Sequence, residues 1–212
     1  SHQFTARASG WMILKRGFDL IFAASVLVVL APVMLLISLW VKADSRGPVL
    51  FRQDRVGLHG RLVTIYKFRT MRADSLLEHQ ARITVGADPR ITRAGALLRK
   101  YKLDELPQFF NVLLGDMSVV GPRPEVPKYV ATYPPQVRDI VLSVRPGITD
   151  LASIEYRNES ELLGQAEDPE TFYLQVVLPR KLEYCVQYVA KRSIWSDISI
   201  VWRTVLAVFG SR

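Results

Sequence analysis

The chain has 212 residues and a mass of 24.1 kDa, enough to bury one hydrophobic core without disulfide bonds. A composition of 49% hydrophobic and 23% charged residues excludes a disordered or low-complexity chain. One cysteine, Cys185, and three histidines, His2, His59 and His79, form no Cys/His zinc motif of familiar spacing. Any bound metal would therefore have oxygen ligands.

The net charge of +8 is concentrated near the N-terminus. Residues 1–75 carry 11 basic and 4 acidic side chains, whereas residues 76–212 carry 17 and 16. This basic segment contains Leu20–Val41, 22 consecutive residues without a charge. Basic residues stand on both sides of the run: Lys15, Arg16, Lys42 and Arg46. Basic residues beside an apolar run favour an anionic membrane surface over a nucleic acid as partner.

The apolar run has three interpretations. As one helix it would extend about 33 Å at ~1.5 Å per residue, enough to cross a ~30 Å hydrocarbon core. Pro32 lies near its middle and favours a kink, because proline removes one backbone hydrogen bond. Basic residues at both ends favour a topology with both ends on one membrane face. The run is thus a re-entrant helix broken at Pro32, a spanning helix or a buried core helix.

The next segments predict a small β-hairpin and a surface helix. Val49–Val56 and Arg61–Phe68 are typical of strands, joined through two glycines within residues 57–60. Residues 74–90 are polar and predict a loop around a short helix. Thr92–Lys102 predicts a basic amphipathic helix, which either lies on a membrane or exposes a solvated face.

The C-terminal half predicts further helices and two stiff turns. Leu106–Leu114 is typical of a buried helix that ends at Gly115. Prolines stiffen turns at Gly121–Pro124 and Arg145–Gly147, and each turn presents an arginine. Apolar residues recur at helical spacing over Ile194–Phe209, which predicts a membrane-lying or core-facing helix. Together the elements predict a single compact domain of the α+β class, mostly helical.

Asp104 and Glu105 are the candidate catalytic residues. Because consecutive side chains of a helix point in different directions, we expect different roles for them. If Asp104 caps the helix and Pro107 lies in its first turn, both acids stay ionised at the positive end of the helix dipole. Such a carboxylate suits a nucleophile or a magnesium ligand in phosphoryl chemistry. Ordinary helix capping would produce the same pattern, so the dyad alone leaves both interpretations open.

Five basic residues are candidate phosphate ligands, because arginine grips phosphate oxygens in a two-point fork and lysine supplies a point charge. These substrate-binding candidates are Lys67, Arg69, Arg99, Arg123 and Arg145. The sequence has no Walker glycine loop and no His-Glu-x-x-His pair, which argues against nucleotide hydrolases and common metalloproteases.

Five motifs, in order, resemble the signatures of bacterial sugar transferases called monotopic phosphoglycosyl transferases. They are Lys67–Met71, Leu103–Gln108, Asn111–Ser118, Gly121–Pro124 and Arg145–Thr149. The resemblance runs from about Lys15 to about Thr204, and its most specific parts are the Asp-Glu-Leu-Pro-Gln and Gly-Pro-Arg-Pro blocks.

The resemblance implies an enzyme that transfers a sugar 1-phosphate from a UDP-sugar to a polyprenyl phosphate such as undecaprenyl phosphate. UMP would be released as glycan assembly begins. The resemblance assigns Asp104 as the nucleophile of a covalent phosphosugar intermediate and Glu105 as the Mg²⁺ ligand. Lys67, Arg99 and Arg123 would orient phosphates.

The resemblance also implies a re-entrant helix broken at Pro32. Residues 11–46 would form the membrane anchor, and residues 47–212 the catalytic domain on the cytoplasmic face of the bacterial inner membrane. The implied partners are the UDP-sugar, the polyprenyl phosphate and the lipid bilayer, with no nucleic acid. The sequence leaves the oligomeric state open, and a homodimer is compatible with it.

Two positions depart from the family pattern. Many members have Gly-Leu-Ala-Gln where this chain has Asp150-Leu151-Ala152-Ser153, and an aspartate is frequent at the position of Cys185. These departures leave the sugar undetermined. The rival hypothesis is a non-catalytic membrane-surface module, and the intact Asp104, Glu105 and Arg123 argue against it.

Overall fold

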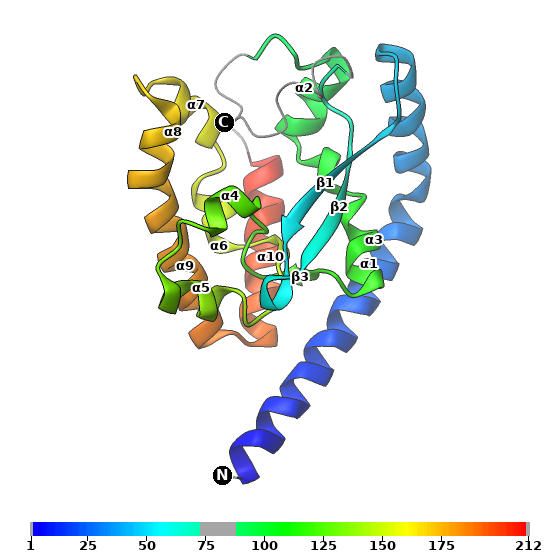
Figure 1. Cartoon of the computed structure of the whole chain (residues 1–212). Coiled ribbons are helices and arrows are strands. Elements are labelled where there is room, and N and C mark those ends of the chain that lie inside the picture. The colour runs from blue at the N-terminus through cyan, green and yellow to red at the C-terminus, as the bar shows by residue number, and fades with distance from the viewer. Residues whose placement is uncertain (1, 73–87, 211–212) are drawn as a thin grey trace.

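The computed structural model describes residues 2–72 and 88–210, with side chains from Trp11 onward. The protein is mostly helical with two small sheets, which confirms the α+β, mostly helical prediction. Helix α1 (His2–Asp44) runs along one side of a compact domain, as Figure 1 shows. The other described α-helices are α2 (Arg93–Lys100), α3 (Gln108–Leu114), α4 (Pro127–Val130), α5 (Pro135–Val141), α6 (Leu151–Glu155), α7 (Glu159–Gly164), α8 (Pro169–Phe172), α9 (Leu178–Lys191) and α10 (Ile194–Phe209).

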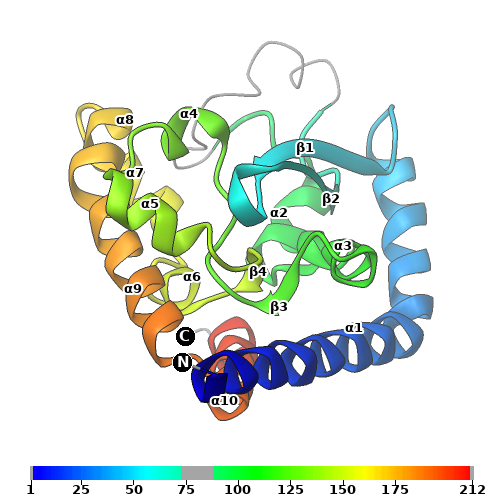
Figure 2. The ribbon, with the colours of Figure 1, turned by 60° about the horizontal axis from the view of Figure 1, so that its bottom comes forward.

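Helix α1 is continuous through Pro32, although its axis changes direction along its length (Figure 2). A bend without a break is the usual effect of one missing helical hydrogen bond. Within the described residues, Trp11–Asp44 is long and apolar enough to cross a membrane, and only 11% of its apolar window is buried. This exposure argues against a buried core helix. The re-entrant topology stays a prediction.

Both halves of α1 pack on the domain. Ala23 in the first half joins a buried cluster with Ile65 and Val112, whereas Val41 in the second half packs with Leu98. The bend is what allows one helix to follow the surface of the domain through both contacts. The exposed remainder of α1 is apolar and faces away from the domain.

A buried network of ion pairs and hydrogen bonds also holds α1 against the rest of the domain. The Lys15 ammonium lies 2.8 Å from an Asp19 oxygen and 2.7 Å from an Asp197 oxygen of α10. The Ser118 hydroxyl donates to Asp19 at 2.8 Å, and the Tyr188 hydroxyl donates to Asp197 at 2.8 Å. One lysine therefore pairs with two nearly inaccessible carboxylates that belong to different helices.

The predicted hairpin is confirmed. Strand β1 (Leu50–Val56) pairs antiparallel with β2 (Leu62–Phe68), and a 3-10 turn at Leu58–Gly60 joins them. Leu50, the first residue of β1, stands opposite Phe68, the last residue of β2. The predicted loop around a short helix at 74–90 lies mostly outside the described residues.

A second, parallel sheet was not predicted. Strands β3 (Ser118–Val120) and β4 (Gly147–Thr149) pair with Ser118 opposite Gly147. A Cβ atom on Gly147 would lie 2.1 Å from the Gly121 nitrogen, so only glycine permits this approach. The sheet thereby brings together the two proline-stiffened turns.

The three predicted helices form close to their expected bounds. α2 begins at Thr92, whose hydroxyl accepts the Gly95 N–H at 3.0 Å, and α3 ends at Gly115 with φ of 94°. α10 buries only Asp197 and Ile200 and leaves its apolar side uncovered. Its most exposed large side chains are Trp195, Trp202, Leu206 and Phe209. This exposure agrees with a surface-lying helix.

We predict that Lys15→Met destabilises the fold, because it leaves two buried carboxylates without a cation. The expected loss is about 3 kcal/mol, or roughly 6–12 °C in the melting temperature, measured by thermal unfolding in detergent. Lys128→Met is the matched control, since the Lys128–Glu170 pair is exposed and should matter by less than about 1 kcal/mol. Equal shifts in both variants would contradict the prediction.

Candidate active site

Asp104 and Glu105 lie in a 3-10 turn, Leu103–Glu105, that precedes α3. Pro107 occupies the position before the first residue of α3, with a helical φ of −61°. The prediction that Asp104 caps this helix is therefore wrong. The chain enters α3 directly from the tighter turn, which buries both carboxylates instead of placing them at the helix terminus.

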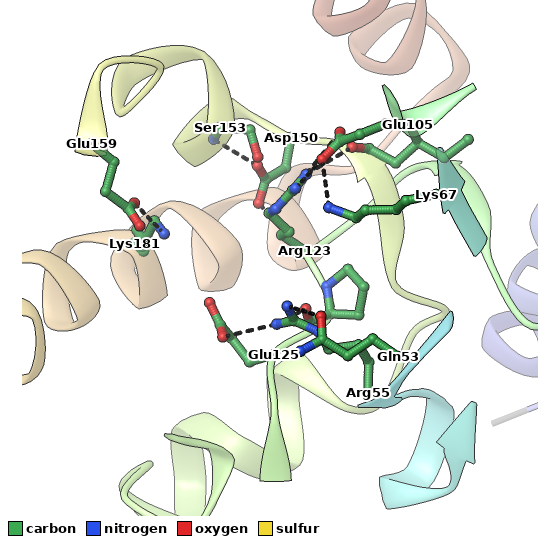
Figure 3. A network of polar contacts seen from close by, with 12 residues as sticks. Gln53, Arg55, Lys67, Glu105, Arg123, Glu125, Asp150, Ser153, Glu159 and Lys181 are labelled. Carbon is green, nitrogen blue, oxygen red and sulfur yellow. Dashed lines mark hydrogen bonds and ion pairs between the residues drawn. The ribbon is translucent and has the colours of Figure 1, made fainter. Parts of the chain in front are cut away.

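Glu105 is the centre of a buried ion triad (Figure 3). The Lys67 ammonium donates to Oε1 at 2.9 Å. Arg123 grips the carboxylate with both terminal nitrogens: Nη2 contacts Oε1 and Nη1 donates to Oε2 at 3.2 Å. Burial opposes ionisation of Glu105, but Arg123 and Lys67 outweigh it and hold its pKa well below the usual range. Glu105 is thus a fixed anion.

Asp104 has the opposite environment. It is 8% exposed, and its Oδ1 atom has no hydrogen-bond partner within the described part of the chain. Burial, and then the charge of Glu105, raise the pKa of Asp104, against smaller opposing effects of Lys67, Lys102 and Arg99. The expected difference in role between the two acids therefore has a structural basis. Within the described residues, Asp104 therefore has a buried carboxylate oxygen without a hydrogen-bond partner, whereas both oxygens of Glu105 are paired.

The structure gathers some of the predicted phosphate ligands and not others. Lys67 and Arg123 contact Glu105, and half-buried Arg99 lies within electrostatic range of Asp104. Arg69 instead donates to Ser45 O at 2.7 Å and to Val41 O at the end of α1. Arg145 donates to Gly115 O at 2.8 Å, after the last turn of α3. The last two arginines therefore bind backbone carbonyls in this structure.

Residues beyond the predicted set hold the Arg123 loop. The backbone N–H of Arg123 donates to Asp150 Oδ2 at 3.2 Å, and the guanidinium of Arg55 donates to Pro124 O at 3.3 Å. Arg55 also contacts Glu125 (Figure 3). Glu125 in turn accepts the Tyr173 hydroxyl at 2.7 Å. The sequence offered one indication that Arg55 could be part of the site: it is a charged residue within a strand of the predicted hairpin.

The carboxylates fit a divalent cation whose shell is completed by substrate. Groups of three or more His, Cys, Asp or Glu ligands do not occur within residues 2–72 and 88–210. Mg²⁺ commonly takes one or two carboxylates and completes its shell with water and phosphate oxygens. Among the described residues, Oε2 of Glu105 has a single partner and Oδ1 of Asp104 has none, so both oxygens keep lone pairs that these residues do not use.

Comparison with known proteins places this geometry in a family. Residues 10–211 match the family described as bacterial sugar transferase, and the chain belongs to that family. It is 38% identical over 203 residues to a UDP-glucose:undecaprenyl-phosphate glucose-1-phosphate transferase of Klebsiella pneumoniae, covering 93% of this chain and 40% of that protein.

Two further relatives differ in how much of their own length the chain covers. A UDP-N-acetylgalactosamine-undecaprenyl-phosphate N-acetylgalactosaminephosphotransferase of Aeromonas hydrophila is 38% identical over 207 residues, covering 95% of this chain and 46% of that protein. The exopolysaccharide production protein PSS of Rhizobium leguminosarum is 38% identical over 210 residues, covering 92% and 95%. The chain therefore spans less than half of the first two relatives and nearly all of the third.

We predict that Asp104→Asn raises the melting temperature at neutral pH. Because the folded-state pKa of Asp104 is raised, its ionised form opposes folding above that pKa, and this penalty vanishes as the carboxyl protonates at lower pH. The expected gain is about 2–4 °C at pH 7.5 and shrinks as the pH falls toward 4. Asp139→Asn, at an exposed site, is the control. A gain that is independent of pH would contradict this explanation.

Proposed function

We propose that the protein transfers a sugar 1-phosphate from a UDP-sugar to undecaprenyl phosphate or a related polyprenyl phosphate. UMP and a polyprenyl-diphosphate-linked sugar are the products. The observation that carries the proposal is the pairing of Asp104, buried with a free oxygen, with Glu105, which assembles Lys67 and Arg123 around it. The names of the relatives describe the same class of donor and acceptor.

In the proposed reaction, Asp104 attacks the phosphorus that carries the sugar. A bond forms between the carboxylate oxygen and phosphorus, and the bond to the oxygen bridging toward uridine breaks, so UMP leaves with that electron pair. A phosphate oxygen of the lipid then attacks the same phosphorus and releases the carboxylate of Asp104. One site would thus serve a soluble donor and a membrane-bound acceptor in turn.

The surrounding cations have assigned roles in this mechanism. Arg123 and Lys67 orient phosphate oxygens from the positions that Glu105 fixes, and Arg99 adds positive charge near Asp104. We assign Mg²⁺ as the cofactor and Glu105 as its ligand through Oε2. When bound, the ion would neutralise charge that develops on the diphosphate during phosphoryl transfer.

Two exposed apolar surfaces support a site at a bilayer. Helix α1 exposes Ile21, Val28 and Leu36, and α10 exposes Trp195 and Trp202. Tryptophan favours the membrane–water boundary, and Lys15 precedes the apolar run of α1. We propose a re-entrant α1, with residues 11–46 as the anchor and residues 47–212 on the cytoplasmic face of the inner membrane.

We predict that Asp104→Asn abolishes nucleotide release while the protein stays folded. UMP is measured with Mg²⁺, undecaprenyl phosphate and UDP-sugars supplied one at a time. The variant should lose at least about a thousandfold in rate, because the amide keeps the shape and removes the nucleophile. Asp139→Asn should remain within about twofold, as expected for an exposed substitution.

Three outcomes of this assay would reject the proposal. They are UDP as the product, UMP release without the lipid phosphate once the first turnover has occurred, and substantial turnover by Asp104→Asn. Glu105→Gln, measured across Mg²⁺ concentrations, separately tests the metal assignment. A higher Mg²⁺ requirement in Glu105→Gln is expected, and an unchanged requirement would reject the ligand role of Glu105 while leaving the nucleophile assignment in place.

We predict that both ends of the apolar run react from the same side of the membrane. Single cysteines at Met12→Cys and Arg46→Cys, each in a Cys185→Ser background, are treated with a membrane-impermeant thiol reagent in oriented vesicles. Both starting side chains are exposed in the structure. Labelling of both only on the cytoplasmic side is expected. Labelling of one site from the opposite side would establish a spanning helix.

A further inference from the structure

Asp150 contacts the Arg123 loop with one oxygen and a helix terminus with the other. Oδ1 accepts the Ser153 N–H at 2.7 Å and so caps α6. Oδ2 accepts the Arg123 N–H at 3.2 Å. The carboxylate is buried, with 3% of the residue exposed, so neither bond competes strongly with water. Figure 3 shows Asp150 beside the Arg123 side chain that reaches Glu105.

The contact between Asp150 and the Arg123 N–H matters because Arg123 lies between two prolines. Pro122 and Pro124 have no N–H, so Arg123 supplies the sole backbone donor of this three-residue segment. Asp150 takes that donor. On the next residue, Arg55 donates to Pro124 O at 3.3 Å, which holds the loop from the other side. The backbone position from which the Arg123 side chain extends is therefore fixed by contacts with Asp150 and Arg55, which lie outside this loop.

We infer that Asp150 is a positioning residue for Arg123 in the proposed transfer reaction. Its carboxylate fixes the backbone from which the guanidinium reaches Glu105 and the substrate phosphate. Its negative charge also adds to that of Glu105 in favouring the Arg123 cation. The inference rests on the proposed function for its catalytic consequence, but the loop contact itself can be tested without turnover.

Helix capping alone is the competing explanation, and one substitution separates the two. Asp150→Ser keeps a short oxygen that can cap α6, because serine is a good N-cap residue, but it removes the acceptor and the charge beside Arg123. The matched control is Asp168→Ser. Asp168 caps α8 by accepting the Glu170 and Thr171 N–H groups, and it does so at an exposed site.

The first measurement is kcat/KM for UMP release by the full chain. Asp150→Ser should lose at least about tenfold, as one well-placed charged hydrogen bond would, whereas Asp168→Ser should stay within about twofold. Asp150→Asn keeps the volume and serves if the serine variant folds poorly. Wild-type activity in both Asp150 variants would overturn the inference.

A double-mutant cycle tests whether Asp150 acts through Arg123. In an Arg123→Lys background, which lacks the two-point grip, Asp150→Ser should lower kcat/KM by less than about threefold, because coupled residues are not additive. An undiminished tenfold loss in that background would mean that Asp150 affects the fold and not the arginine.

Hydrogen exchange over residues 119–126 supplies a readout that needs no substrate. Asp150→Ser should accelerate exchange of this segment, and Asp168→Ser should not. If the wild-type protein released no UMP, the proposed function would fail, and exchange would still decide whether Asp150 holds the loop. Unchanged exchange in Asp150→Ser would overturn the inference whatever the activity.

Discussion

One buried carboxylate, Glu105, holds together three segments that are far apart in the sequence. Lys67 comes from the end of β2, Arg123 from the loop after β3, and Glu105 from the turn before α3. Removal of the carboxylate would leave two buried cations facing each other, which is far more costly than the loss of a surface ion pair. Because Glu105 satisfies both cations, the neighbouring Asp104 is left with an oxygen that no side chain claims.

Local sequence patterns predicted the elements that depend on neighbouring residues. The hairpin, helix α2 and the end of α3 were predicted from two strand-like segments joined through glycines, an amphipathic pattern and a C-terminal glycine. The parallel pair β3 and β4 has strands of three residues each, too short to produce a pattern, and its pairing joins segments some 30 residues apart. Glycine at positions 121 and 147 permits that pairing, but a sequence does not show which two glycines will meet.

The sequence did not show which group each basic side chain of the site would bind. Residue type and motif identified Arg123 and Lys67 as well as Arg69 and Arg145, yet the last two donate to carbonyls at helix ends. The two departures from the family pattern also proved to be neighbours, since the Cys185 thiol lies 3.8 Å from Asp150 Oδ2. The two positions are 35 residues apart in the sequence, but their side chains lie next to each other beside the Arg123 loop.

The end of strand β2 contacts both the ion triad and the end of α1. Lys67 binds Glu105, and only two residues later Arg69 takes the carbonyls of Val41 and Ser45 where α1 ends. Between them, Phe68 is buried in the cluster that includes Val41. Within the described residues, the end of the apolar helix and the ion triad are therefore linked through direct contacts of three consecutive residues of one strand and its end. In the proposed membrane arrangement, the depth of α1 in the bilayer would therefore set the height of the two carboxylates above it.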